Sequence, residues 1–310
     1  MKKSLSTSTV AAVAAGAAAS VVSNAALAAD AMVVAEPEWY LSLEGGAIFA
    51  DPATDKFGVS GSGFSNVNDF DTDFGYRGAA AIGRKFDDNL DWRLGVAYSD
   101  FLKNHASLSF SGGSGSGSVD INGGTDLSYL TGDLELGYNV RPSDRFDLRL
   151  FAGLRALNSN DSQDKFGDIS GGPFSGGTIA FDGKVDTEFL GIGPRVGVDF
   201  SSRLGEGPLG FSGMLATSVL FGELKQKMSF TASSGGSSIG SSFSEDKNET
   251  VFNLEAAFGA DFHIADSSVL TIGYRGEYWD SIRGGGTDKM GSGGDDMLSH
   301  GPFVRFIANF

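Results

Sequence analysis

Apolar and polar residues alternate along most of the chain with a period of two, as in a strand whose two faces meet different surroundings. In the segment TVFNLEAAFGADFHI, Phe252, Leu254 and Phe258 fall on one face, whereas Glu255 and Asp261 fall on the other. The chain after its N-terminus shows no convincing helical period. The pattern therefore predicts an all-β protein.

Ten segments carry this alternation, at residues 38–50, 74–86, 91–102, 125–140, 146–157, 186–200, 209–222, 251–264, 269–280 and 300–310. The connections between them alternate between long (51–73, 103–124, 158–185, 223–250 and 281–299) and short (87–90, 141–145, 201–208 and 265–268). A soluble sandwich also has alternating strands, but a barrel with its long loops at one surface explains the alternating connections as well. We predict a transmembrane antiparallel up-and-down β-barrel of about 10 strands, with 8 or 12 as alternatives.

Aromatic residues of the apolar face gather where the strands meet the short connections. They are Trp39, Phe86, Trp92, Tyr138, Phe146, Phe200, Phe262 and Phe310. Such a girdle is typical of the boundary between lipid and water, and it favours the membrane barrel over the sandwich. An even strand number places both chain ends on the short-turn, periplasmic side. The long connections are rich in Gly and Ser, so we expect exposed loops without a core of their own.

The N-terminus has the three parts of a secretory signal peptide. Lys2 and Lys3 supply a basic start, residues 10–22 form a mildly apolar stretch, and Ala26 and Ala28 form an A-x-A cleavage site. A membrane anchor would need a longer and more apolar segment. The sequence therefore predicts export from the cytoplasm.

We expect residues 1–28 to be the signal peptide and residues 29–310 to form a single outer-membrane barrel domain with long extracellular loops. Cleavage would remove two of the 23 basic side chains and none of the 39 acidic ones, so the formal net charge changes from −16 to −18. This charge argues against nucleic acid as a partner. The absence of cysteine excludes disulfides and cysteine-ligated zinc.

The polar face, which points inward in a membrane barrel, carries eight basic and eight acidic side chains at central strand positions. They are Arg77, Lys85, Arg93, Arg149, Arg155, Arg195, Arg275 and Arg305, with Glu44, Asp133, Glu135, Asp147, Asp199, Glu255, Asp261 and Glu277. These charges either pair across a narrow lumen and plug it, or line a water-filled pore in which inward glycines leave space. The residues alone leave both interpretations open.

Three segments resemble a known family: residues 189–225 (FLGIGPRVGVDFSSRLGEGPLGFSGMLATSVLFGELK), residues 273–282 (GYRGEYWDSI) and the ending GPFVRF. They are similar to the pore-forming outer-membrane proteins related to the Legionella major outer membrane protein. The resemblance implies a channel-forming barrel of a Gram-negative bacterium. Cysteine cross-linking, which the Legionella protein uses, is not carried over because this chain has no cysteine.

With this resemblance we expect a narrow, porin-like diffusion pore for ions or small solutes, lined by the sixteen charged residues. The alternative is a closed barrel that acts as a structural or surface-interaction protein, adhesin-like or antigenic. Both place the protein in the bacterial outer membrane, with the lipid bilayer as a partner. The sequence is compatible with a homo-oligomer.

The C-terminus resembles the signal by which the barrel assembly machinery recognises outer-membrane proteins. Val304, Phe306, Ala308 and Phe310 put apolar side chains at alternate positions up to a terminal aromatic residue. We expect the assembly machinery to be a partner through this strand.

The sequence holds little material for catalysis. The histidines are His105, His263 and His300, and none stands in a pattern that supplies both a nucleophile and an orienting acid. Residues 284–296 are acidic and glycine-rich but lack the spacing of a calcium loop. We expect no enzyme, no cofactor and no metal site.

Overall fold

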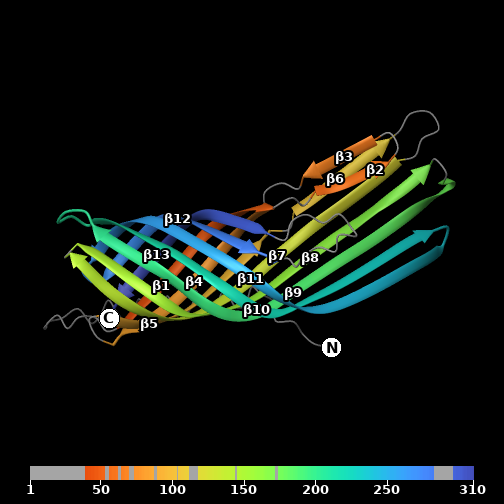
Figure 1. The fold of residues 1–310 in the computed structure, drawn as a ribbon. Coiled ribbons are helices and arrows are strands. Elements are labelled where there is room, and N and C mark those ends of the chain that lie inside the picture. Colours follow the sequence, from red (N-terminus) through yellow and green to blue (C-terminus); the bar gives the residue numbers. More distant parts are fainter. Residues whose placement is uncertain are drawn as a thin grey trace.

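The computed structural model describes residues 39–52, 56–61, 64–69, 73–86, 89–102, 104–111, 118–143, 145–171, 174–282 and 296–310. Its strands are β1 (Trp39–Pro52), β2 (Lys56–Gly61), β3 (Phe64–Asp69), β4 (Asp73–Lys85), β5 (Leu90–Phe101), β6 (Asn104–Ser111), β7 (Ser118–Ser143), β8 (Phe146–Gly171), β9 (Phe174–Arg203), β10 (Leu209–Ser234), β11 (Ser237–Ala265), β12 (Ser268–Asp280) and β13 (Met297–Asn309) (Figure 1). None of the described segments is a helix with the length and apolarity to cross a membrane. The predicted signal peptide, with Ala26 and Ala28, lies outside the described residues.

The strands form a closed antiparallel barrel. Neighbours around the ring are β5, β4, β1, β13, β12, β11, β10, β9, β8 and β7, and the pairing of β7 with β5 closes it. Closure leaves none of these ladders with an open edge inside the membrane, where an unpaired backbone group would be costly. The prediction of an antiparallel membrane barrel of about ten strands is confirmed.

The strand ends near the short turns agree with the sequence predictions within three residues. At this end the first and last described strands meet, because Trp39 N donates to Phe310 O at 3.0 Å and Phe310 N donates to Trp39 O at 2.9 Å. The alternation fixes these positions, since a register slip of one residue would turn a whole apolar face into the lumen. Val304, Phe306, Ala308 and Phe310 accordingly share the outer side of the closing segment.

The prediction of long loops is wrong for most of residues 158–185 and 223–250, and for residues 118–124, because these residues continue the barrel strands. Residues 104–111, and residues 56–61 and 64–69 within the predicted loop 51–73, form the additional strands β6, β2 and β3. β10 and β11 stay paired up to Ser234 and Ser237, and the turn between them is only Gly235 and Gly236, with φ of 58° and 83°. Two adjacent glycines suit such a two-residue hairpin turn. The ladder hydrogen bonds supply the order that the Gly/Ser-rich composition was expected to lack.

These long strands build a sheet that stands beyond the barrel on one side (Figure 1). β7 pairs with β5 only from Ser128 onward, and β11 pairs with β12 only from Phe252 onward. β6 takes over the edge of β7 from Thr125 outward. We call β6, together with the parts of β7–β11 that extend beyond the level of these pairings, the projecting sheet.

The outer surface of the barrel is apolar, as the lipid-facing surface of a membrane barrel must be. Large apolar side chains such as Leu94, Leu134 and Val196 are half exposed, whereas their inward neighbours Glu135 and Arg195 are buried. This arrangement is the reverse of a soluble sandwich, whose apolar face would be the buried one. It confirms which face of the alternating pattern meets the lipid.

Two aromatic bands lie on the outer surface. Near the short turns the predicted girdle includes Trp39, whose ring packs edge-on against Trp92 at 5.8 Å. A second band, which the sequence prediction missed, lies toward the other end of the barrel. There Tyr76 and Tyr98 both donate to Asp100 Oδ2, at 2.8 and 3.3 Å. Two bands of this kind mark the two membrane–water interfaces.

Gly193 on β9 permits close contact with β10. A Cβ atom at this position would overlap Val219 O and lie 2.9 Å from Leu220 Cα. We expect Gly193→Ala to lower the free energy of unfolding by about 1–3 kcal/mol, as overpacking typically does. Urea titration of the protein folded in lipid vesicles measures this.

The matched control is Gly276→Ala on β12, because a Cβ atom there meets nothing within 4 Å. An equal loss in both variants would contradict a steric cause at Gly193.

Candidate functional site in the barrel lumen

The inward side chains of the barrel form one continuous network of ion pairs, none longer than 4.0 Å. Among the described residues it joins seven arginines and seven carboxylates: Arg77, Arg93, Arg149, Arg155, Arg195, Arg275 and Arg305, with Glu44, Asp91, Asp133, Glu135, Asp199, Glu255 and Glu277. The network is therefore formally neutral. A buried charge requires such pairing, because a carboxylate or guanidinium removed from water without a partner is very costly.

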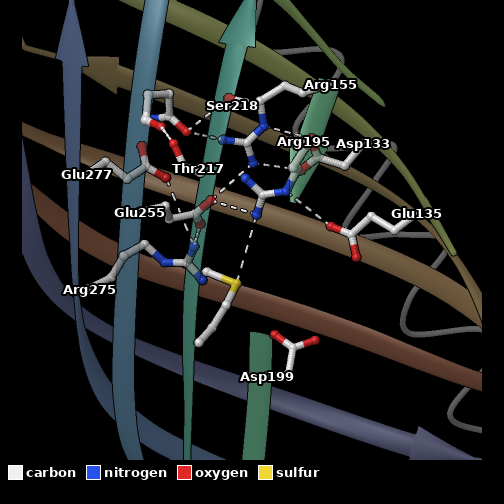
Figure 2. A network of polar contacts seen from close by, with 12 residues as sticks. Asp133, Glu135, Arg155, Arg195, Asp199, Thr217, Ser218, Glu255, Arg275 and Glu277 are labelled. Atoms are coloured by element: carbon white, nitrogen blue, oxygen red, sulfur yellow. Dashed lines mark hydrogen bonds and ion pairs between the residues drawn. The ribbon is translucent and has the colours of Figure 1, made fainter. Parts of the chain in front are cut away.

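Glu255 on β11 is the centre of this network (Figure 2). Its Oε2 atom lies 3.1 Å from Arg155 Nη2 and 2.9 Å from Arg195 Nη2, and its Oε1 atom accepts a hydrogen bond from Arg275 Nη1. Arg77 Nη2 lies 3.9 Å from the same carboxylate. These arginines come from β8, β9, β12 and β4, so one side chain, only 2% exposed, braces strands on different sides of the ring.

Glu44 on β1 connects the first strand of the ring to the last. Its Oε2 atom lies 2.7 Å from Arg305 Nη2 on β13 and 2.8 Å from Arg275 Nη2 on β12. Arg77 Nε on β4 lies 3.7 Å from its other oxygen. The seam between β1 and β13 is thus held by lumen charges as well as by the ladder.

Arg149 on β8 organises the part of the network nearest the short turns. Its guanidinium donates to Asp91 Oδ1 at 2.7 Å, to Asp199 Oδ2 at 2.9 Å and to Glu135 Oε2 at 3.1 Å. It also lies over the ring of Phe151, 5.1 Å from the centroid. The planar fork of arginine allows these contacts at once, which a lysine could not match.

On the long-strand side of the network the lumen is filled by an apolar cluster. Its side chains are 0–6% exposed and come from β1, β5 and all strands from β7 to β13, with Ile282 just after β12. The cluster consists of Ile48, Ala50, Phe101, Leu127, Tyr129, Leu157, Phe189, Leu220, Leu224, Val251, Trp279, Ile282 and Met297. The Trp279 ring meets Tyr129 edge-on at 5.6 Å. Tyr129 in turn donates to Glu277 Oε2 at 2.7 Å, which joins the cluster to the ion pairs. Network and cluster together leave these side chains almost no contact with water.

On the short-turn side the lumen keeps a cavity of about 550 Å³. Its inner part is lined by the network, including Arg93 and Asp199, and its mouth by Lys85, Arg145 and Arg203 beside the short turns. The described lumen is therefore a vestibule that ends at the ion pairs and the apolar cluster.

The predicted inward residues all lie in the lumen. Fifteen of the sixteen line the cavity, and Glu277 lies in the network beside the apolar cluster. Lys85, Asp147 and Asp261 stand outside the ion-pair network, and Asp261 Oδ1 instead accepts hydrogen bonds from Thr271 and Ser212 at 2.6 and 2.8 Å. That these residues line a conducting pore stays a prediction.

Two parts of the lumen were not predicted from the sequence: Asp91 and the whole apolar cluster. Asp91 pairs with Arg149 but stands at the start of its strand, outside the central strand positions to which the prediction applied. The sequence does contain a signal for the cluster, because Leu127 and Tyr129 are an even number of positions from Asp133 on β7 and therefore share its inward face. The inward face therefore changes from polar to apolar along one strand.

The histidines with described side chains make structural contacts. His263 Nδ1 lies 3.2 Å from Pro208 O beside a short turn. His300 stacks on Tyr274 on the outer surface, with Nδ1 2.6 Å from the tyrosine hydroxyl. Nothing is described for the side chain of His105, and residues 283–295 of the suggested loop lie outside the described part.

Comparison with known proteins gives a family. The model of the family described as Legionella pneumophila major outer membrane protein precursor matches residues 36–308. No curated protein matches the chain in sequence. Among solved structures, the outer membrane protease OmpT from Escherichia coli is similar, with 10% identity, a TM-score of 0.43 and coverage of 91% of this chain and 99% of that one. Neisserial surface protein A has 11% identity, a TM-score of 0.28 and coverage of 88% and 97%.

Proposed function

Since the chain belongs to the family of the Legionella pneumophila major outer membrane protein, we propose that it is an outer-membrane barrel whose lumen is closed at rest and whose projecting sheet acts as an interaction surface. This is the structural or surface-interaction alternative from the sequence. Catalysis has no part in the proposal.

The occlusion of the lumen carries this proposal. The apolar cluster draws side chains from nine of the ten ring strands and is continuous with the neutral ion-pair network. A path for ions would require the cluster to separate, at a cost of about 25 cal/mol for each Å² of apolar surface exposed to water. It would also require several buried ion pairs to break.

The projecting sheet supports the second half of the proposal. β7–β11 have 26–30 residues each, whereas β1, β4, β5, β12 and β13 have 12–14. About ten residues suffice to cross a bilayer in a tilted strand, so the rest stands outside it. Ile239 and Phe243 near its tip are exposed, although burial of large apolar side chains is the usual outcome for strands. A surface of this size and composition suits a partner outside the cell.

The narrow diffusion pore remains the second candidate, and the cavity of about 550 Å³ favours it. Charged side chains already line the cavity on the short-turn side, so displacement of the apolar cluster would complete a passage. The residues around Glu255 would then set size and charge exclusion.

Conductance distinguishes the two candidates. We expect purified, folded protein in planar lipid bilayers to give no discrete conductance steps at neutral pH. Heat-dependent migration on gels provides the control that the barrel is folded. Regular, long-lived conductance steps from the folded protein would contradict the closed barrel and support the diffusion pore.

We also propose that the assembly machinery recognises β13. Val304 on this closing strand and Phe310 directly after it are exposed on the outer surface, and β13 pairs with β1 where the first and last strands of the ring meet.

A further inference from the structure

The mouth of the lumen cavity carries positive charge that the ion-pair network does not neutralise. Because the network as a whole is formally neutral, excess charge among the described cavity residues comes from those outside it: Lys85, Arg145 and Arg203 against Asp147 and Asp261. Asp261 is only 5% exposed and accepts hydrogen bonds from Ser212 and Thr271. Among the described residues that line the accessible mouth, three cations therefore stand against one carboxylate, Asp147.

None of the three cations has an ion-pair partner within the described part of the chain. No described carboxylate lies within 4.0 Å of the charged atoms of Lys85, Arg145 or Arg203, and no described side chain bonds to them. Every arginine of the network, in contrast, has at least one carboxylate partner, as Arg305 has in Glu44.

Two of these cations are neighbours across a ladder. Arg203 N, at the end of β9, donates to Arg145 O, just before β8, at 3.0 Å. Both line the cavity, and both are exposed. Like charges placed opposite each other on adjacent strands destabilise a sheet. An anion held between them would remove this repulsion.

The chemistry of the pair selects oxyanions. Each guanidinium presents five N–H donors in a planar fork, a geometry that matches the oxygens of phosphate and carboxylate groups. Lys85 adds a third positive charge from β4. The volume of about 550 Å³ lies in the range of small-molecule sites.

We propose that Arg145, Arg203 and Lys85 form a binding site for a phosphate-type oxyanion at the short-turn mouth of the barrel. The anion is carried by a small solute or by a lipid headgroup. The site is independent of whether the lumen conducts, because its residues lie outside the ion-pair network and the apolar cluster.

Titration calorimetry on the folded protein in uncharged detergent tests the site, with pyrophosphate as the probe. We expect saturable binding that the double variant Arg145→Gln/Arg203→Gln weakens at least about tenfold, because charge-assisted contacts are lost. Lys85→Gln should weaken binding by a smaller factor. The matched control is Lys225→Gln/Lys227→Gln, which removes two exposed cations from the projecting sheet and should leave binding unchanged.

A second titration, with a short-chain phosphatidylglycerol, separates the two sources of the anion. Stronger binding of the lipid than of pyrophosphate assigns the site to a headgroup, and the reverse assigns it to a soluble ligand. The proposal is overturned if neither probe binds saturably, or if the Arg145/Arg203 and Lys225/Lys227 variants lose affinity equally. Because all these side chains are outside the network, the variants are expected to fold like the native chain.

Discussion

Replacing Glu255 with glutamine is expected to lower the free energy of unfolding by about 3–5 kcal/mol, the usual cost of breaking a buried ion pair by removing one partner. The change keeps the shape of the side chain but removes the carboxylate that Arg155, Arg195 and Arg275 share. The arginines remain buried with less compensating charge. Urea titration of the protein refolded in lipid vesicles, followed by tryptophan fluorescence, gives the value.

The control for Glu255→Gln is Glu223→Gln on the projecting sheet. Glu223 pairs with Lys225 at 3.5 Å, but its side chain is 52% exposed, and pairs of this kind contribute less than about 1 kcal/mol. If both variants lost less than about 1 kcal/mol, the network would not be the electrostatic brace of the barrel.

Replacing Trp279 with alanine is expected to cost about 3–5 kcal/mol, as is usual when a large aromatic side chain is removed from a core. Trp279 is fully buried and contacts Tyr129 edge-on, and Arg155 lies 5.9 Å from its ring centroid. Its loss leaves a hole between the apolar cluster and the ion pairs. The same urea titration measures the change.

Ile239→Ala provides the comparison, because this side chain near the tip of the projecting sheet is 75% exposed. Its replacement should change the free energy of unfolding by no more than about 0.5 kcal/mol. A loss of similar size at both positions would mean that the lumen cluster is not a core.

The barrel itself could be predicted from the sequence because lipid imposes a strict period of two on its outer surface. Leu254 and Phe258 must face outward, which sends Glu255 inward, and the same logic placed Arg155 and Arg195 in the lumen. The short turns were also visible, since strands in a membrane barrel end where the apolar pattern ends.

Two features could not be derived from the same pattern. The projecting sheet escaped prediction because its strands at Ser233 and Ser238 have no buried face, so backbone pairing alone orders them. The division of the lumen into ion pairs and an apolar cluster depends on which inward side chains meet across the ring. Tyr129 and Glu277 are 148 residues apart in the chain, and only the closed ring brings them into contact.

The two-residue turn at Gly235 and Gly236 determines how far the projecting sheet extends beyond the barrel. Fourteen residues of β11, from Ser237 to Thr250, precede the buried Val251. At about 3.3 Å per residue they span roughly 45 Å along the strand, or about 35 Å of height at the usual tilt of barrel strands. In the proposed role, with the projecting sheet outside the cell, a phage, an antibody or a host surface would touch Ile239 and Phe243 well before it reached the lipid headgroups.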